Sequence, residues 1–393
     1  MISASVFRAI VTSAAFVATL AATAHAADGP TPLDDGDRGG VVYAMTNASS
    51  GNQILAFARD RSGRLQPLPF ATVATGGRGA SDNAAIDPLG SQHSLVYDAA
   101  SDSLFAVNAG DNTVSALDTG PFGLKLRVRA RVPSGGFIPV SLAVSGERLY
   151  VLNAGGTGSV TTFAIDAHGV PTKVASLDLG LAPQATTPPF AQVPAPGQVG
   201  VDALARRLIV TSAAGQDLLV AALDDDGVPH GPLTATPTPG AGTFSFDVTP
   251  YGTILVAEAA TSSVSAFDPA AVDAPLTLTT GAVGTGQAAT CWIVVHRSGF
   301  AYVANTGSGT LSRYRYTRTG HIALDAAIAA NVSGAPTDLT LAGRGDFLYA
   351  LDAARGAIAG FSVDPRSGSL RPVETQGGLP AAAGIQGIAA RDF

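Results

Sequence analysis

The chain has 393 residues, of which 13% are charged, and it contains 46 glycines and 25 prolines. Short apolar runs between these glycines and prolines are typical of strands and tight turns, which argues against a mainly helical protein. The formal net charge is −7, with only two lysines and no basic run, so neither nucleic acid nor an anionic lipid surface is expected as a partner.

Residues 1–26 have the pattern of a secretory signal peptide. Arg8 precedes an apolar run, and Ala24, His25 and Ala26 form a small-x-small cleavage site. An uncleaved membrane anchor is the alternative, but the run is rich in alanine and close to the lower limit of about 18 residues for crossing a bilayer. We therefore expect a periplasmic or secreted protein in which residues 27–39 are a linker, with no integral membrane segment after signal removal.

The mature chain would carry 22 Lys and Arg against 30 Asp and Glu, a net charge of −8. Its single cysteine, Cys291, excludes an intrachain disulfide. No disulfide therefore stabilises the exported protein, and packing of the core must stabilise the fold instead.

One phrase recurs seven times along the chain. The copies are VVYAMTN (41–47), LFAVNAG (104–110), LYVLNAG (149–155), LIVTSAAG (208–215), ILVAEAA (254–260), AYVANTG (301–307) and LYALDAA (348–354). A short apolar run precedes each phrase, and an alternating run and a polar run follow it. Four strands in about 40–50 residues make the unit of a propeller blade. The sequence thus predicts an all-β protein, a seven-bladed β-propeller with four-stranded antiparallel blades over residues 40–393.

The two ends of the propeller are expected to meet in blade one. An open ring would leave an unpaired strand edge at each end. The first copy of the phrase lacks a strand before it, whereas the C-terminal GIQGIAARDF resembles the first strand of the other copies. We expect residues 384–390 to complete blade one as its inner strand.

The two longest segments outside the repeat, 71–92 and 179–198, both connect one blade to the next. Such connections lie on the face where the inner strands begin. Long loops on one face of a rigid scaffold often carry binding sites, and tolerated surface insertions are the alternative. The sequence therefore predicts a candidate binding site at this end of the central channel, the predicted mouth.

Cys291 and His296 are excluded as a nucleophile and its base. They lie at opposite ends of one predicted inner strand, and five residues at about 3.3 Å each separate them by about 16 Å, far more than a hydrogen bond of about 3 Å.

Several polar residues lie where inner strands begin. His93 is the only histidine near this end of an inner strand, and it is a candidate catalytic residue; a satisfied structural histidine is the alternative. Gln198, Cys291 and Asp338 occupy matching repeat positions in their own blades and are candidate substrate-binding residues. Burial as a small apolar residue is the alternative for Cys291.

A second series of residues ends the repeated phrase. It consists of Asn108, Asn153, Ser212, Glu258, Asn305 and Asp352. Asn and Asp favour turns, which explains most of the series. Glu258 is a poor turn former and is a candidate catalytic carboxylate, and Asn305 is a candidate substrate-binding residue. No compact acidic loop or histidine spacing accompanies the series, so no cofactor is expected, and a divalent cation held by these Asn, Glu and Asp residues is the alternative.

The phrases NQILAF, GSQHSL, FAVNAGDNTVSAL, AYVANTGSGTLS and GLPAAAGIQGIAARDF together resemble the lactonase family of seven-bladed propellers. This family is related to cycloisomerase-type 6-phosphogluconolactonases and to carboxymuconate-lactonising enzymes. The resemblance implies hydrolysis or formation of a lactone, with a histidine, arginines and a carboxylate near the channel mouth. His93 resembles the family's histidine, and Glu258 lies near the position of its glutamate. No inner strand here begins with arginine.

Two functions follow from the sequence. The first is an exported lactonase-like hydrolase or cycloisomerase, in which His93 or Glu258 activates water while Gln198 and Asn305 steady the oxyanion. The second is a non-catalytic exported propeller that binds a ligand or a protein partner on its top face. In either case a monomer is expected, and the residues alone leave open whether the protein is an enzyme.

Overall fold

The computed structural model describes residues 38–393 except 69–71, 81–85, 190–194, 205 and 269–274. The chain divides into two units, residues 1–32 and 33–393, and all of the structure described belongs to the second. The predicted signal peptide, most of the predicted linker and parts of the two long connections lie outside the described residues.

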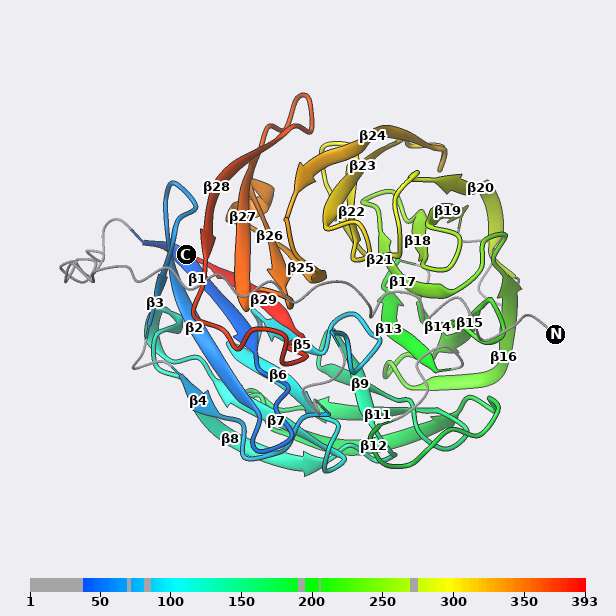
Figure 1. Ribbon diagram of the computed structural model, residues 1–393. Coiled ribbons are helices and arrows are strands. Elements are labelled where there is room, and N and C mark those ends of the chain that lie inside the picture. The colour runs from blue at the N-terminus through cyan, green and yellow to red at the C-terminus, as the bar shows by residue number, and fades with distance from the viewer. Residues whose placement is uncertain (1–37, 69–71, 81–85, 190–194, 205, 269–274) are drawn as a thin grey trace. The chain divides into compact units, whose positions relative to one another are not determined.

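Seven antiparallel sheets stand around a common centre (Figure 1), and each sheet is one blade. Blade one contains β29 Ile388–Asp392, β1 Arg38–Met45, β2 Gln53–Asp60, β3 Leu65–Pro67 and β4 Val73–Ala74. Blade two contains β5 Leu95–Asp98, β6 Ser103–Asn108, β7 Thr113–Asp118 and β8 Arg127–Pro133. Blade three contains β9 Pro139–Ser145, β10 Arg148–Asn153, β11 Ser159–Ile165 and β12 Pro171–Asp178.

The remaining four blades repeat this plan, with the inner strand first in the chain. Blade four contains β13 Pro196–Asp202, β14 Arg207–Ser212, β15 Asp217–Leu223 and β16 Pro229–Pro237. Blade five contains β17 Thr243–Val248, β18 Ile254–Glu258, β19 Ser263–Asp268 and β20 Thr277–Gly284. Blade six contains β21 Thr290–His296, β22 Phe300–Asn305, β23 Thr310–Tyr316 and β24 Ile322–Asn331. Blade seven contains β25 Pro336–Ala342, β26 Phe347–Asp352, β27 Ala357–Val363 and β28 Leu370–Gln376.

Helical structure among the described residues is limited to short 3₁₀ turns, η2 Pro121–Gly123 and η3 Gly343–Gly345. No helix in the described ranges is long and apolar enough to cross a membrane.

The two ends of the propeller meet in blade one, as the sequence predicts. β29 pairs antiparallel with β1 from Ile388 opposite Ala44 to Asp392 opposite Gly40. The paired strand begins four residues later than position 384. Before it, Gln386 is fully buried and hydrogen-bonds with the segment ahead of β5 rather than with β1. The predicted fold is therefore confirmed, with a shorter closing strand.

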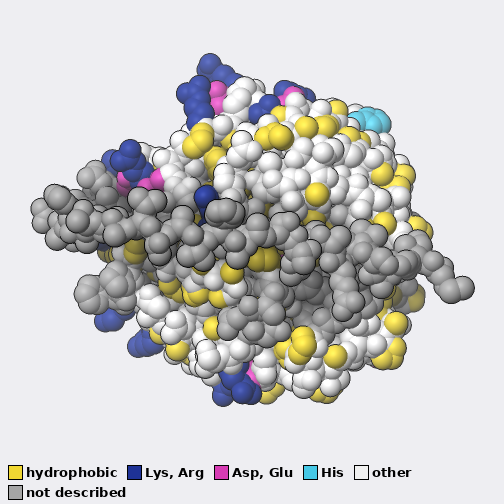
Figure 2. All heavy atoms as spheres, in the orientation of Figure 1, with side chains coloured by type: hydrophobic (Ala, Val, Ile, Leu, Met, Phe, Trp, Pro, Cys, Tyr) yellow, Lys and Arg dark blue, Asp and Glu magenta, His cyan; other side chains and the backbone are white. Residues whose placement is uncertain are grey.

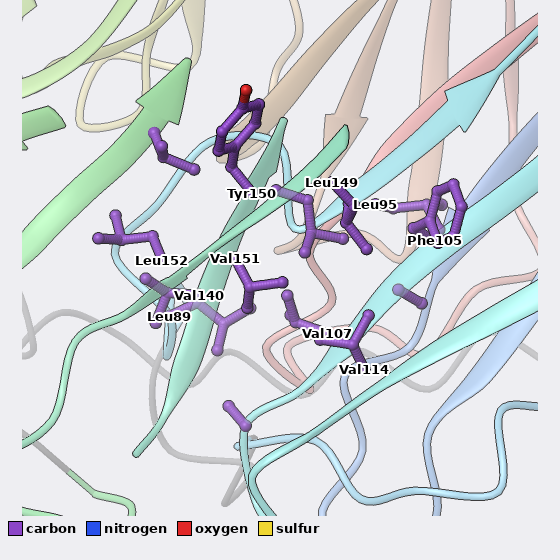
Figure 3. Packing of buried hydrophobic residues seen from close by; sticks show 14 of the residues in the cluster. Leu89, Leu95, Phe105, Val107, Val114, Val140, Leu149, Tyr150, Val151 and Leu152 are labelled. Atoms are coloured by element: carbon purple, nitrogen blue, oxygen red, sulfur yellow. The ribbon is translucent and has the colours of Figure 1, made fainter. Parts of the chain in front are cut away.

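The repeated phrase is the second strand of each blade. Its side chains are apolar on both faces of the sheet because each face packs against a neighbouring blade. Every residue of β6, β14, β18, β22 and β26 is buried. Figure 3 shows the packing between blades two and three, where Phe105 and Val107 of β6 lie near Leu149 and Val151 of β10. The outer strands are mostly exposed or partly exposed, as β12 is after its first residue.

Tyrosines of the repeated phrase also join neighbouring blades by hydrogen bonds. In four copies the buried tyrosine hydroxyl donates to the carbonyl of a glycine in the turn between the third and fourth strands of the next blade. These pairs are Tyr43 with Gly123, Tyr150 with Gly227, Tyr302 with Gly368 and Tyr349 with Gly63. A buried tyrosine needs such a partner, so the repeat sets both the packing and the spacing of the blades.

Candidate functional site

Residues 89–92 fill the end of the central channel at which the inner strands begin, and we call this segment the plug. All four residues are buried. The Ser91 hydroxyl donates to Val140 O of blade three, the Gln92 N–H donates to Gly197 O of blade four, and the Trp292 indole of blade six donates to Ser91 O. Because the plug binds blades on opposite sides of the ring, the predicted mouth is closed by the chain itself.

The opposite end of the channel is accessible. Inner strands are buried where they begin and partly exposed where they finish, as in β5, β9 and β17. Two adjoining cavities of about 270 and 300 Å³ lie here, and both are lined by His93, Val96, Tyr97 and Asp247. These volumes are near the lower end of the range for small-molecule sites, roughly 300–1,000 Å³.

His93 follows the plug directly and lies half-buried at the inner end of both cavities. Its backbone is in the left-handed region (φ 63°), which turns the chain from the plug into β5. Its Nδ1 lies 3.3 Å from Gln198 Nε2, and its Nε2 lies 3.4 Å from Gln92 Nε2. Burial lowers the pKa of His93 to about 4, so the imidazole is neutral at physiological pH.

Both glutamines are fixed by backbone groups of another blade, Gln198 by the adjacent blade five and Gln92 by blade six. Gln198 Oε1 accepts from Phe246 N (2.7 Å) and its Nε2 donates to Phe246 O (2.9 Å). Gln92 makes the same pair of bonds with Ile293 N and O, at 3.0 and 2.9 Å. Each amide therefore presents its nitrogen to His93, and its two N–H groups are directed at a carbonyl and at the imidazole.

Both neighbours of the His93 ring nitrogens are hydrogen-bond donors. A neutral imidazole has one acceptor nitrogen and one N–H, so only one amide can donate to the ring at a time. The remaining N–H has no acceptor among the described residues, and a protonated ring would have two such groups. This arrangement adds to the effect of burial in disfavouring the imidazolium.

Asp247 is the acidic residue in the lining of both cavities. Its Oδ1 accepts from its neighbour Val248 N and its Oδ2 accepts from Val295 N of blade six, both at 2.7 Å. Burial raises the pKa of Asp247 to about 6, against the opposing effect of these two hydrogen bonds. A carboxyl group with this pKa can exchange a proton near neutral pH.

Sequence reasoning missed Asp247 although the repeat contains a signal for it. The strand registers align Asp247 with residues of the other inner strands that are small, apolar or uncharged. These are Val96, Ala143, Gly200, Val294, Thr340 and Ala389. Asp247 is the only acidic residue at these seven aligned positions. An alignment of the inner strands would have identified it.

Of the six residues proposed from the sequence, the cavities bring together His93 and Gln198. The other four are not part of the lining. Asp338 is buried and accepts hydrogen bonds from Leu339 N and from Ile388 N of the closing strand. Burial raises its pKa well above the usual range.

Glu258 and Asn305 are buried inside their blades. Asn305 Nδ2 donates to the hydroxyls of Thr310 and Ser312, five and seven residues later. The Glu258 carboxylate accepts from the hydroxyls at the same two offsets, Ser263 and Ser265, and from Gly240 N. Glu258 therefore has the same position and the same bonding pattern as the asparagines of the series.

Cys291 is buried, and its thiol pKa is raised, chiefly by burial, which disfavours a nucleophilic thiolate. The register of β21 pairs Trp292, not Cys291, with the strand position that faces Ser245 and Gln198 in other blades. Cys291 thus lies one residue before the position that its repeat alignment suggested. Trp292 packs edge-to-face on Phe244 beneath the plug.

Positive charge does not gather at the cavities. Their described lining contains no Lys or Arg. On the face that Figure 2 shows, basic side chains lie in small groups near the periphery, several of them beside an acidic side chain. Among the described residues, no three His, Cys, Asp or Glu side chains lie close enough together to hold a metal ion.

Comparison with known proteins identifies the family. Residues 70–385 match the family described as "Lactonase, 7-bladed beta-propeller". No curated protein sequence matches the chain significantly.

Solved structures share the architecture. The periplasmic gluconolactonase of Pseudomonas aeruginosa is 16% identical, with a TM-score of 0.69 over 90% of this chain and 98% of its own. A candidate 6-phosphogluconolactonase from Bacteroides fragilis is 16% identical, with a TM-score of 0.70 over 92% and 100%. A protein from Lactobacillus plantarum is 19% identical, with a TM-score of 0.70 over 91% and 99%. At these identities the structures show a common fold, and the match over residues 70–385 shows that the chain belongs to the lactonase family of seven-bladed β-propellers.

Proposed function

We propose that the chain is an exported, monomeric hydrolase that opens a lactone ring in the central channel. Membership of the lactonase family supports lactone chemistry. The observation that carries the proposal is that His93 and Asp247 line the same cavities, one held neutral and the other with a pKa near the operating pH. Pairs of titratable groups whose pKa values are moved apart by their environments are typical of acid–base sites.

Asp247 is proposed as the general base. Each of its carboxylate oxygens accepts one backbone N–H and keeps a lone pair for a water molecule. The water proton passes to Asp247 as the water oxygen bonds to the lactone carbonyl carbon. The bond from that carbon to the ring oxygen then breaks, and the proton passes from Asp247 to the released alkoxide, which leaves a hydroxy acid.

His93 is proposed to polarise the lactone carbonyl. Its neutral ring always carries one N–H, and both neighbouring amides are donors that cannot accept it. A carbonyl oxygen in the cavity would supply the missing acceptor and would gain negative charge in the transition state. Gln198 and Gln92 act as positioning residues in this scheme, because backbone groups of other blades hold both amides beside the His93 ring.

Asp247 is preferred over Glu258 as the base because of the contacts of each carboxylate. Glu258 is fully buried and receives three hydrogen bonds from its own blade and the preceding connection. Asp247 is partly exposed to the cavity.

The test is a lactone panel assayed with protein recovered after export, which should have lost residues 1–26. We expect wild-type protein to open at least one lactone, with and without chelator, and His93→Ala to lower kcat/KM by about 10²-fold or more. Asp325→Asn, on the outer strand of blade six, is the matched control. Full activity in both His93→Ala and Asp247→Asn would contradict this site. Binding of lactones without ring opening would support the non-catalytic alternative.

A further inference from the structure

The polarity of the channel changes along its length. His93, Gln198 and Asp247 lie at the inner end, beneath the plug. At the outer end the inner strands contribute a ring of mainly apolar side chains, which we call the collar. It consists of Tyr97, Val144, Val201, Val248, Leu341 and Ala390, and all six are partly exposed in the cavities.

The one polar group on a collar side chain is already in use. The Tyr97 hydroxyl donates to Asp102 Oδ1 at 2.8 Å. The collar side chains therefore offer a ligand chiefly apolar surface and an aromatic ring.

The described lining of the two cavities supplies no cation for an anionic substrate. The nearest one in the chain to a collar residue is Arg391, which follows Ala390. Its guanidinium forms an ion pair with Asp102 at 3.0 Å and donates to the Thr119 hydroxyl and to Gly120 O. An ionised Asp247 inside the cavity would further disfavour a phosphate or carboxylate group on the substrate.

We infer that the substrate is a neutral lactone that carries an apolar substituent, an inference that rests on the proposed function. When the lactone ring lies beside His93 and Asp247, the plug blocks the inner end of the channel. Any substituent on the lactone ring must therefore extend toward the collar. A polyhydroxylated ring would bury hydroxyl groups there without partners, which is costly. An alkyl chain would instead exchange water for the side chains of Val144, Val201 and Leu341.

The test is a series with a constant ring, δ-valerolactone, δ-octalactone and δ-decalactone, compared with glucono-δ-lactone. Dissociation constants are measured by calorimetry with Asp247→Asn, which should open the ligands far more slowly than wild-type protein, and kcat/KM is measured with wild-type protein. We expect binding to strengthen by about 2- to 4-fold for each added methylene until the collar is filled. We expect glucono-δ-lactone to bind more weakly than δ-octalactone.

Val144→Asp tests the collar directly. It should abolish most of the gain with chain length and leave the binding of δ-valerolactone within about 2-fold. Val174→Asp is the matched control in the same blade, because Val174 lies exposed on the outer strand β12. A circular dichroism melt of both variants identifies any loss of fold.

The outcomes separate the two proposals. If wild-type protein opens glucono-δ-lactone in preference to δ-decalactone, the apolar substituent is wrong and the lactonase function stands. If no lactone is opened, the proposed function fails, and the calorimetric series still decides the inference about the collar. Equal affinity along the series would overturn that inference.

Discussion

Asp247 shows how one side chain can differ from its equivalents in a repeat. At the aligned positions of the other inner strands the channel is lined by residues such as Val96, Ala143 and Val294. A carboxyl group among such neighbours loses hydration, which raises its pKa to about 6 although two backbone N–H groups bind it. The repeat supplies the apolar surroundings, and the one carboxyl group among the aligned positions is the proposed base.

The pH dependence of the reaction follows from this pKa. The proposed base must be ionised, so kcat/KM should be constant above about pH 7 and fall about tenfold for each pH unit well below 6. His93, with a pKa of about 4, should not contribute a second change in this range. The measurement is a pH–rate profile between pH 4.5 and 9 with a lactone that wild-type protein opens.

Asp247→Asn provides the control for this profile. We expect it to lose about 10²- to 10⁴-fold in kcat/KM and to lose the acidic limb in any residual activity. An unchanged acidic limb in this variant would assign the titration to another group, such as Asp87, whose pKa burial raises to about 7.

Glu258 shows which part of the site the sequence could not predict. The sequence predicts a catalytic role for it because glutamate is a poor turn former, but the structure gives it hydroxyl partners equivalent to those of Asn305, at the same offsets. The serines at 263 and 265 were visible in the sequence. What was missing was the side-chain geometry of the repeat, which makes these hydroxyls converge on the end of the second strand.

At the scale of elements, the plug determines where a ligand can enter. The sequence predicted that the long connection 71–92 lies where the inner strands begin and is a candidate binding loop. It could not predict that 89–92 turns inward, because this depends on partners that are distant in the chain: Ile293, Trp292, Val140 and Gly197. The same connection therefore closes the predicted mouth and presents His93 to the channel from the other side.

Gln92 is expected to be the main support of the plug. Gln92→Ala would leave Ile293 N and O buried without these partners, and we expect it to lower the free energy of unfolding by about 2–4 kcal/mol. It should also lower kcat, because His93 loses one of its two fixed neighbours. Chemical denaturation and steady-state kinetics measure the two effects.

Gln53→Ala is the control for this variant, because Gln53 is an exposed glutamine of β2. If both variants had the same stability as wild-type protein, the plug would not depend on the side chain of Gln92.

At the scale of the whole molecule, the sequence predicted the fold well because a propeller is a repeated local pattern. Seven copies of one phrase determine seven blades, and each of the four tyrosines in the phrase bonds to the next blade in the same way. The incomplete first copy and the unpaired C-terminal strand predicted closure. Some alignments from the sequence are shifted by one residue, such as Cys291 for Trp292, because the register of several inner strands shifts near their first residues.

Ring closure makes the C-terminus important for stability. Asp392, the last residue of β29, forms a 2.8 Å ion pair with Arg59 of blade one and accepts hydrogen bonds from Gly343 N and Arg344 N of blade seven. The Arg59 side chain is only 3% exposed and also lies 5.3 Å from the Phe347 ring centroid. Asp392→Ala would therefore leave a buried guanidinium without its carboxylate and would loosen the contact between the first and last blades.

We expect Asp392→Ala to lower the free energy of unfolding by about 2 kcal/mol, less than the roughly 3–5 kcal/mol for a fully buried pair because Asp392 is 35% exposed. Asp225→Ala is the matched control, since the Arg206–Asp225 pair has the same 2.8 Å distance but is largely exposed, and it should cause no measurable change. Urea denaturation compares the two variants. Equal effects would mean that ring closure depends on the β1–β29 backbone pairing and not on this buried arginine.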